Sequence, residues 1–287
     1  MGILEIIVGL ASQSVSLWAD GVHSIATATV LLIVWIGLHL SGRSPDGTFH
    51  FGYYRFETLG SLFAAFLMTV FGGLVVLEAY MAWIEQTVLT NAELAIAVAL
   101  SAASIGIIVS IMIQRASRIY GSTSLRVGAL NGLLDVLSSF AVSLGVFMSF
   151  YLGIRHADTV AGLLIAFAIF SGAYSIFKEA SLVLTDACRC GDIVSAIGDI
   201  AKKMKEIKEV HSIRMRQLGP YLVGDMHVVV DSEMLVRDAD RISTELENKI
   251  KEEFGSVIEL KVRIESDEAH SLHSKKLTVK SDTSSKV

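Results

Sequence analysis

The stretch Ser16–Leu40 reads SLWADGVHSIATATVLLIVWIGLHL, an apolar run that carries ionisable groups near its start. A helix that crosses a bilayer needs about 20 mostly apolar residues, so this stretch predicts a membrane span. A charge in hydrocarbon is costly unless a partner, water or an ion compensates it, which makes Asp20 and His23 candidates for function. The stretch therefore predicts a membrane helix and a site within it.

A second apolar span, Leu125–Leu152, contains a matching polar group that begins at Asn131 and ends at Asp135. Because each residue advances about 100° around a helix, the polar residues of each span share a face. These residues are Asp20, His23, Ser24 and Thr27 on the first helix and Asn131 and Asp135 on the second. If the two faces meet, they surround one point with nitrogen and oxygen groups, which suits a divalent first-row metal.

Each polar residue also has a plainer interpretation. A hydroxyl or amide such as Thr27 or Asn131 often makes a hydrogen bond between membrane helices. His23 has the alternative of a neutral ring bonded to a backbone carbonyl, and Asp20 is either a ligand or a partly hydrated residue at the outer rim. For Asp135 a functional role is favoured, because a lone buried carboxylate without a partner is rare.

The composition excludes an ordinary soluble protein and argues against two classes of function. Mean hydropathy is +0.57, with 52% hydrophobic and 18% charged residues. The net charge of −5 and the lack of a basic groove argue against a nucleic-acid partner. The sequence displays no nucleophile–base pair or phosphate-binding loop, so we do not expect an enzyme.

Apolar stretches predict an all-α membrane bundle of six helices whose first helix, Met1–Ala11, is truncated. The other spans are predicted at Ser16–Leu40, Phe56–Ile84, Ala92–Gln114, Leu125–Leu152 and Asp158–Phe177. The short first helix reflects either a late start in the gene model or a cut-down helix. Lysine and arginine residues concentrate in the links after the first and third of the full spans and after the last, which orients the C-terminus toward the cytoplasm.

Beyond about Asp186 the pattern becomes that of a small soluble domain with the order α-β-β-α-β. Its elements are predicted at Ile193–Ile207, Val210–Gln217, Tyr221–Val230, Val236–Phe254 and Val257–Ile264. This order suggests an open-faced α+β sandwich. We therefore expect a transmembrane domain over residues 1–186, a cytoplasmic domain over 187–270, and a disordered tail rich in Ser, Lys and Thr over 271–287.

The cysteines, Cys188 and Cys190, are separated by a single residue. Such close cysteines rarely form a structural disulfide, so we expect a reduced linker, with a soft-metal pair as the alternative.

Several motifs together resemble the cation diffusion facilitator family. The run Ser14–Ser24 looks like the second helix of that family, and Phe51–Glu57 (FGYYRFE) resembles its FGxxRxE entry to the third. Val210–Pro220 and Asp225–His227 resemble its soluble domain. The resemblance covers nearly the whole chain, and it implies six helices and a ferredoxin-like, metallochaperone-like cytoplasmic domain.

The resemblance implies a four-ligand membrane site made of His23, Thr27, Asn131 and Asp135. Zinc transporters of this type usually carry a carboxylate at the position of Thr27 and often a histidine at that of Asn131. These two departures leave a dication facing one carboxylate, so either Asp20 supplies a second charge or metal binds weakly. The oxygen-rich set favours harder ions such as manganese or iron over zinc.

The resemblance also points to sites on the cytoplasmic side. Residues at or near positions that carry metal ligands in relatives are His211, His227, Asp240, Glu265 and Asp267, with a plain solvated surface as the alternative. A further loop site at Asp46 is expected to be absent, because Phe49 and Tyr53 occupy the histidine positions of the family. Arg55 and Asp186, at the cytoplasmic membrane edge, are expected to form a structural charge pair.

We therefore expect a secondary transporter that exports a divalent cation of the zinc, manganese, iron or cobalt class, by proton antiport. It would form a homodimer or a heterodimer with another family member in a lipid membrane. Metal would be its substrate and a regulator, with no tightly bound cofactor. The alternative is a scaffold or regulatory subunit that transports little, as in magnetosome iron handling, and the residues Thr27 and Asn131 favour it.

Overall fold

The structure is a computed structural model that describes residues 1–85, 89–120 and 123–268. Side chains are described except at 117–118, 120, 123–131 and 133–134. The chain forms two compact units, Met1–Gly37 with Leu59–Lys178 and Leu38–Thr58 with Glu179–Val287. The loop that follows the second helix thus belongs to the unit that contains the C-terminal region.

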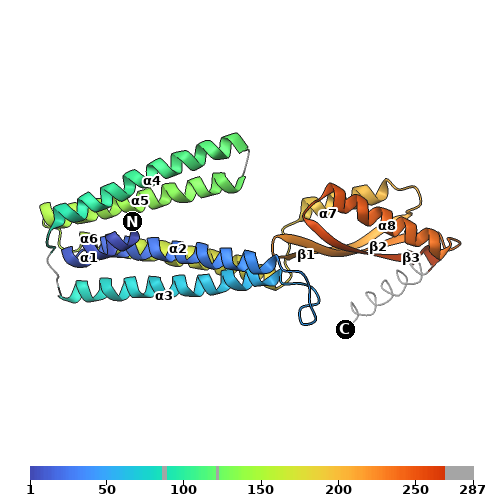
Figure 1. Ribbon diagram of the computed structural model, residues 1–287, viewed down its shortest axis with the longest axis horizontal. Coiled ribbons are helices and arrows are strands. Elements are labelled where there is room, and N and C mark those ends of the chain that lie inside the picture. The colour runs from blue at the N-terminus through green and yellow to red at the C-terminus, as the bar shows by residue number, and fades with distance from the viewer. Residues whose placement is uncertain (86–88, 121–122, 269–287) are drawn as a thin grey trace, which may run out of the picture. The chain divides into compact units, whose positions relative to one another are not determined.

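The predicted spans are helices. They are α1 Gly2–Ser12, α2 Val15–Ser41, α3 Arg55–Glu85, α4 Ala92–Tyr120, α5 Thr123–Tyr151 and α6 Ala157–Leu184 (Figure 1). Within the described residues, α2, α3, Ala92–Ala116 of α4 and α6 are long and apolar enough to cross a membrane. Helix α6 continues past the expected end at Phe177, because Lys178 and Glu179 end the apolar run without breaking the helix.

Small residues let the membrane helices approach closely. A Cβ atom on Gly9 of α1 would lie 2.6 Å from the backbone nitrogen of Trp18, and one on Gly21 of α2 would lie 2.8 Å from the carbonyl oxygen of Gly2. Such contacts are typical of helix pairs in membranes, where packing rather than the hydrophobic effect drives association. Helix α1 therefore lies directly against the backbone of α2, although it is short.

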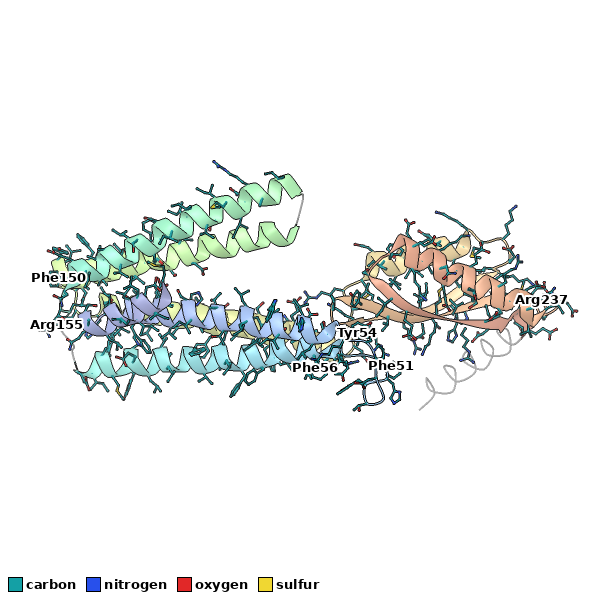
Figure 2. All side chains as sticks on the ribbon, viewed as in Figure 1. Phe51, Tyr54, Phe56, Phe150, Arg155 and Arg237 are labelled. Carbon is teal, nitrogen blue, oxygen red and sulfur yellow. A yellow bond between two sulfur atoms is a disulfide. The ribbon has the colours of Figure 1, made fainter. Side chains whose placement is uncertain are left out.

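Apolar side chains cover the outside of the helices and also fill the spaces between them. Leu17 and Val75 are fully buried, whereas Phe167 is 74% exposed. Phe150 lies near the end of α5, and Arg155 lies in the short link before α6 (Figure 2). Exposed apolar surface of this kind suits a lipid environment.

The soluble region has the predicted element order. Its elements are α7 Gly191–Lys202, β1 Glu209–Leu218, β2 Tyr221–Val230, α8 Val236–Glu253 and β3 Val257–Ser266. In the described chain the sheet has the order β1-β2-β3, with β1 antiparallel and β3 parallel to β2. Helix α7 ends before the expected Ile207, because a turn after Lys202 leads Met204 and Ile207 into the core.

One face of the sheet carries the core. Met226, Val228 and Val230 of β2 pack with Ile197 of α7 and Leu246 of α8, both fully buried. Because successive side chains of a strand point to opposite faces, the residues between them lie on the other face of the sheet. Figure 1 shows both helices on the same side of the strands.

The expectation of reduced cysteines is wrong. Cys188 and Cys190 form a disulfide in the segment between α6 and α7. One intervening residue leaves their Cα atoms 5.3 Å apart, within the range of about 4.4–6.8 Å that disulfides require. The short spacing therefore does not prevent the bond.

Candidate metal centre

In the unit made of Met1–Gly37 and Leu59–Lys178, the structure brings together one residue from each of the two polar helix faces predicted above. The Nε2 atom of His23 in α2 lies 3.3 Å from Oδ1 of Asp135 in α5. The other ring nitrogen of His23 is buried and has no hydrogen-bond partner among the described atoms. A histidine that faces a carboxylate while a ring nitrogen stays unpaired can exchange a proton for a metal ion.

The exposure of Asp135 differs from the expectation. Its side chain is 57% exposed, whereas that of His23 is 18% exposed. Asp135 is therefore not a buried carboxylate in the single chain, because the described side chains cover the α2 half of the pair and leave the α5 half open. Thr27 lies half-buried one turn from His23, and the side chain of Asn131 lies outside the described part of the chain.

Asp20 does not lie at a hydrated rim. Its side chain is buried, and its two oxygens accept hydrogen bonds from the hydroxyls of Ser138 at 2.7 Å and Ser139 at 2.8 Å. Both serines belong to α5, so this carboxylate links α2 to α5 on the side of the His23–Asp135 pair. The serines were not singled out in the sequence, although they follow Asp135 by three and four positions and so share its face.

Two further buried carboxylates were also missed. Glu5 of α1 is 1% exposed and accepts a hydrogen bond of 3.2 Å from the hydroxyl of Ser24. Asp158 of α6 accepts hydrogen bonds from Ser14, Ser16 and the backbone nitrogen of Val15. The sequence contained a signal for each of them. Glu5 is a charged residue inside the apolar first helix, and Asp158 is the residue at which the last predicted span begins.

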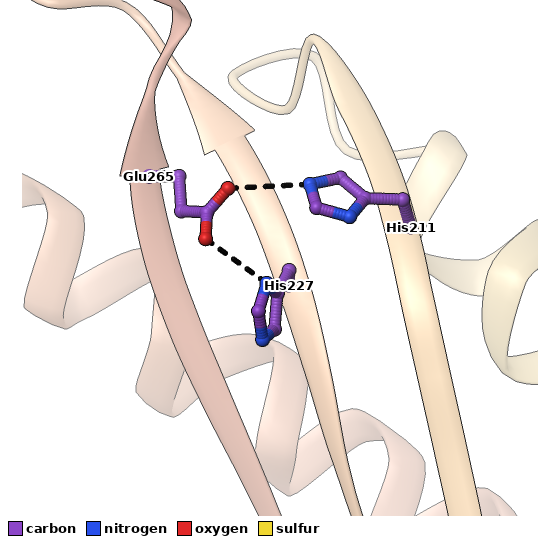
Figure 3. A group of neighbouring side chains, drawn as sticks. All are labelled: His211, His227 and Glu265. Atoms are coloured by element: carbon purple, nitrogen blue, oxygen red, sulfur yellow. Dashed lines mark ion pairs between the residues drawn. The ribbon is translucent and has the colours of Figure 1, made fainter. Parts of the chain in front are cut away.

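On the face of the sheet opposite α7 and α8, three side chains form a compact group (Figure 3). They are His211 of β1, His227 of β2 and Glu265 of β3, and their ligand atoms all lie within 4.8 Å of one another. Oxygens of Glu265 lie 3.3 Å from Nε2 of His211 and 3.0 Å from Nδ1 of His227. Sheet register explains the grouping, because His211 is the direct antiparallel partner of His227. Two imidazoles and a carboxylate are ligands that zinc and similar ions accept.

The structure does not bring Asp240 or Asp267 into this group. Asp240 lies on α8, which packs on the opposite face of the sheet. Asp267 instead lies 2.7 Å from the Nζ atom of Lys208. This hydrogen bond, together with one from Ser232, lowers the pKa of Asp267 from 3.8 to about 2.

Asp186, which follows α6, pairs with Arg55 at the start of α3 and with Arg216 of β1. Its oxygens lie 2.9 Å from Nη2 of Arg55 and 3.3 Å from Nη1 of Arg216. The hydrogen bond from Arg55, more than any other contact, lowers the pKa of Asp186. All three side chains are about half exposed, so the attraction is screened by water.

Asp46 has a structural role in the loop before α3. Its carboxylate accepts hydrogen bonds from the hydroxyl of Tyr53 at 2.5 Å and from the backbone nitrogens of Thr48 and Phe49 at 2.8 Å each. The bond from Tyr53 is the main cause of the lowered pKa of Asp46. These contacts hold the loop in a turn.

Comparison with known proteins places these features in a family. The family model described as the cation efflux transmembrane domain matches residues 1–185, and that described as the cation efflux protein, cytoplasmic domain, matches residues 191–267. The chain is 29% identical over 253 residues to the manganese efflux system protein MneS of Bacillus subtilis (strain 168), covering 87% of this chain and 86% of the relative. It is 25% identical over 267 residues to the magnetosome protein MamB of Magnetospira sp. (strain QH-2), with 90% and 88% covered.

A solved structure to which the chain is similar is the metal-bound C-terminal domain of the CzcD transporter from Thermotoga maritima. The identity is 19% and the TM-score 0.26, with 26% of this chain and 87% of that chain covered. The two family models together span nearly the whole sequence. The chain therefore belongs to the cation diffusion facilitator family of cation efflux proteins, as an integral membrane protein with a cytoplasmic C-terminal domain.

Proposed function

We propose that this chain exports a divalent first-row metal ion from the cytoplasm and takes up protons in return. The observation that carries the proposal is the His23–Asp135 contact of 3.3 Å between two helices of the membrane unit. Thr27 and Asn131 would complete the ligand set, with Asp20 as a fifth candidate. Both His23 and Asp135 must be unprotonated to bind metal, so metal binding releases protons and protonation expels metal.

We propose a harder ion, manganese or iron, over zinc as the substrate. One imidazole accompanied by hydroxyl, amide and carboxylate oxygens matches the preferences of manganese better than a histidine-rich set would. Manganese efflux in the name of the MneS relative agrees with this choice.

The cytoplasmic group of His211, His227 and Glu265 is proposed as a regulatory metal site. It lies on the face of the sheet opposite α7 and α8, where a second copy or another family member can reach it. Metal bound between two such faces would favour one arrangement of a dimer by its differential affinity for that arrangement. We also propose that the chain consists of a transmembrane domain over residues 1–186, a cytoplasmic domain over 187–270 and a C-terminal tail over 271–287.

Transport in proteoliposomes tests the membrane site. Asp135→Asn and His23→Ala each remove one proposed ligand, so Mn²⁺ transport and the accompanying pH change should both fall by at least about tenfold. Glu78→Gln is the matched control, because Glu78 lies on an exposed part of α3. This variant should transport normally. Normal transport by both site variants would refute the proposed function, and transport without a pH change would refute only the proton exchange.

A second candidate function is that of a scaffold or regulatory subunit with little transport. Thr27 stands where family members commonly have a carboxylate, which favours this candidate, and the MamB relative is a magnetosome protein. Thr27→Asp separates the two functions. If the native chain shows only background transport and Thr27→Asp transports above background, the result would support the scaffold or regulatory function.

A further inference from the structure

Glu5 is a buried carboxylate of the membrane helices that the proposed mechanism does not use. It lies in α1 with a relative exposure of 1%, among the most buried side chains of the described chain. The hydroxyl of Ser24, the residue after His23, donates a hydrogen bond of 3.2 Å to its Oε2 atom. Burial of an acidic group in a membrane helix is costly, so it indicates a function.

The packing of α1 holds Glu5 in this place. A Cβ atom on Gly2 would lie 2.9 Å from Cβ of Ser24, and a Cβ atom on Gly21 would lie 2.7 Å from the side chain of Ile6. Both glycines flank the contact between Glu5 and Ser24. Any larger residue at either position would push α1 away from α2, and the carboxylate would move with it.

The charge of the transport site explains what Glu5 can contribute. A doubly charged ion held by His23 and Asp135 has one carboxylate among these two ligands, and the hydroxyl of Thr27 adds no charge. Both oxygens of Asp20 accept hydrogen bonds from serines of α5, so the charge of Asp20 acts where the two helices are linked. In a medium of low dielectric constant, a carboxylate stabilises a cation beyond the distance of direct contact.

We propose that Glu5 is a charge-compensating residue of the transport site, which supplies negative charge beyond that of the ligands for a dication held by His23 and Asp135. It is a positioning residue rather than a ligand: it acts on the ion through its field and on His23 through Ser24. The inference rests on the proposed function, and it explains how a site with threonine at position 27 holds a divalent ion.

Transport kinetics with Mn²⁺ in proteoliposomes of the full chain test the inference. Glu5→Gln keeps the size and the hydrogen-bond acceptor but removes the charge, so KM for Mn²⁺ should rise about tenfold or more. Ser24→Ala removes the hydrogen bond and keeps the charge, so its KM should rise much less. Glu78→Gln serves as the control for removal of an exposed carboxylate.

The decisive variant is the double substitution Glu5→Gln with Thr27→Asp. A negative charge restored at position 27 should return KM to within about threefold of the native value, which a merely structural role of Glu5 would not allow. An unchanged KM in Glu5→Gln, or no recovery in a folded double variant, would overturn the inference. Loss of transport in Asp135→Asn alongside a normal Glu5→Gln would leave the proposed function standing, whereas normal transport in both Asp135→Asn and His23→Ala would remove it.

Discussion

Single carboxylates fix the geometry of the membrane helices, and Asp158 is the clearest case. It accepts hydrogen bonds from Ser14 at 2.8 Å, from Ser16, and from the backbone nitrogen of Val15 at 2.7 Å. The first amide groups of a helix have no partner within it, so a carboxylate from α6 caps α2 from outside. The position of Asp20 and His23 along α2 therefore depends on a residue far away in the sequence.

Replacing Asp158 by alanine should lower the thermal stability of the detergent-solubilised protein. The change leaves the start of α2 without its cap and two buried hydroxyls without an acceptor, at a cost of about 1–3 kcal/mol. The measurement is the unfolding temperature followed by tryptophan fluorescence. Asp192→Ala, at an exposed position in the first turn of α7, is the control and should change little. Equal unfolding temperatures for Asp158→Ala and the native chain would contradict the capping role.

The order of strands decides which residues meet on the sheet. His211, His227 and Glu265 come from three different strands and face away from α7 and α8. Sequence alone predicted strand Tyr221–Val230 with the observed bounds, because a turn at Gly219-Pro220 and an apolar run delimit it. It could not show which face α8 covers, and therefore could not show that Asp240 lies apart from the two histidines.

The same limit applies to the membrane helices. Periodicity placed His23 and Asp135 on the faces that meet, since apolar runs and polar spacing are local properties. The partners of Asp20, Ser138 and Ser139, and the approach of α1 to Ser24 depend on how separate helices pack. Such contacts have no local signal, because a serine or a glycine in a membrane helix is common in any role.

Metal should stabilise the sheet if the cytoplasmic group binds it. Millimolar Mn²⁺ or Zn²⁺ should raise the unfolding temperature of the native chain, because a ligand that binds the folded state alone shifts the equilibrium. Glu265→Gln should abolish most of this increase, and Asp240→Asn should retain it. If Glu265→Gln keeps the full increase, the three residues are not the site.

At the scale of the whole molecule, exposed acidic groups with lowered pKa values gather in the unit made of Leu38–Thr58 and Glu179–Val287. They are Asp46, Asp186, Asp231, Glu245 and Asp267. Each has an ion-pair or hydrogen-bond partner that favours its charged form. A group whose pKa is lower in the folded state stabilises that state above its unfolded pKa, and the contribution disappears as the pH falls through the folded value.

Acid should therefore unfold this unit. For Asp267 the contribution is complete above its ordinary pKa of 3.8 and is lost as the pH falls to about 2. Lys208→Met removes the main cause of the shift, so the acid midpoint followed by circular dichroism should move to higher pH. Lys249→Met, which removes a single-partner ion pair on α8, should have the smaller effect. An acid midpoint unaffected by Lys208→Met would show that the ion pairs of Lys208 do not contribute to stability.

In the described chain, β1 and β3 are the edge strands of the sheet, and this has a consequence for handling the protein. An edge strand offers unpaired backbone groups to any other extended chain. On β3, the charged side chains at every second position, Glu259, Lys261 and Arg263, oppose such pairing. Neutralising them would invite fibrous self-association of cytoplasmic fragments, even where the fold and metal ligands remain intact.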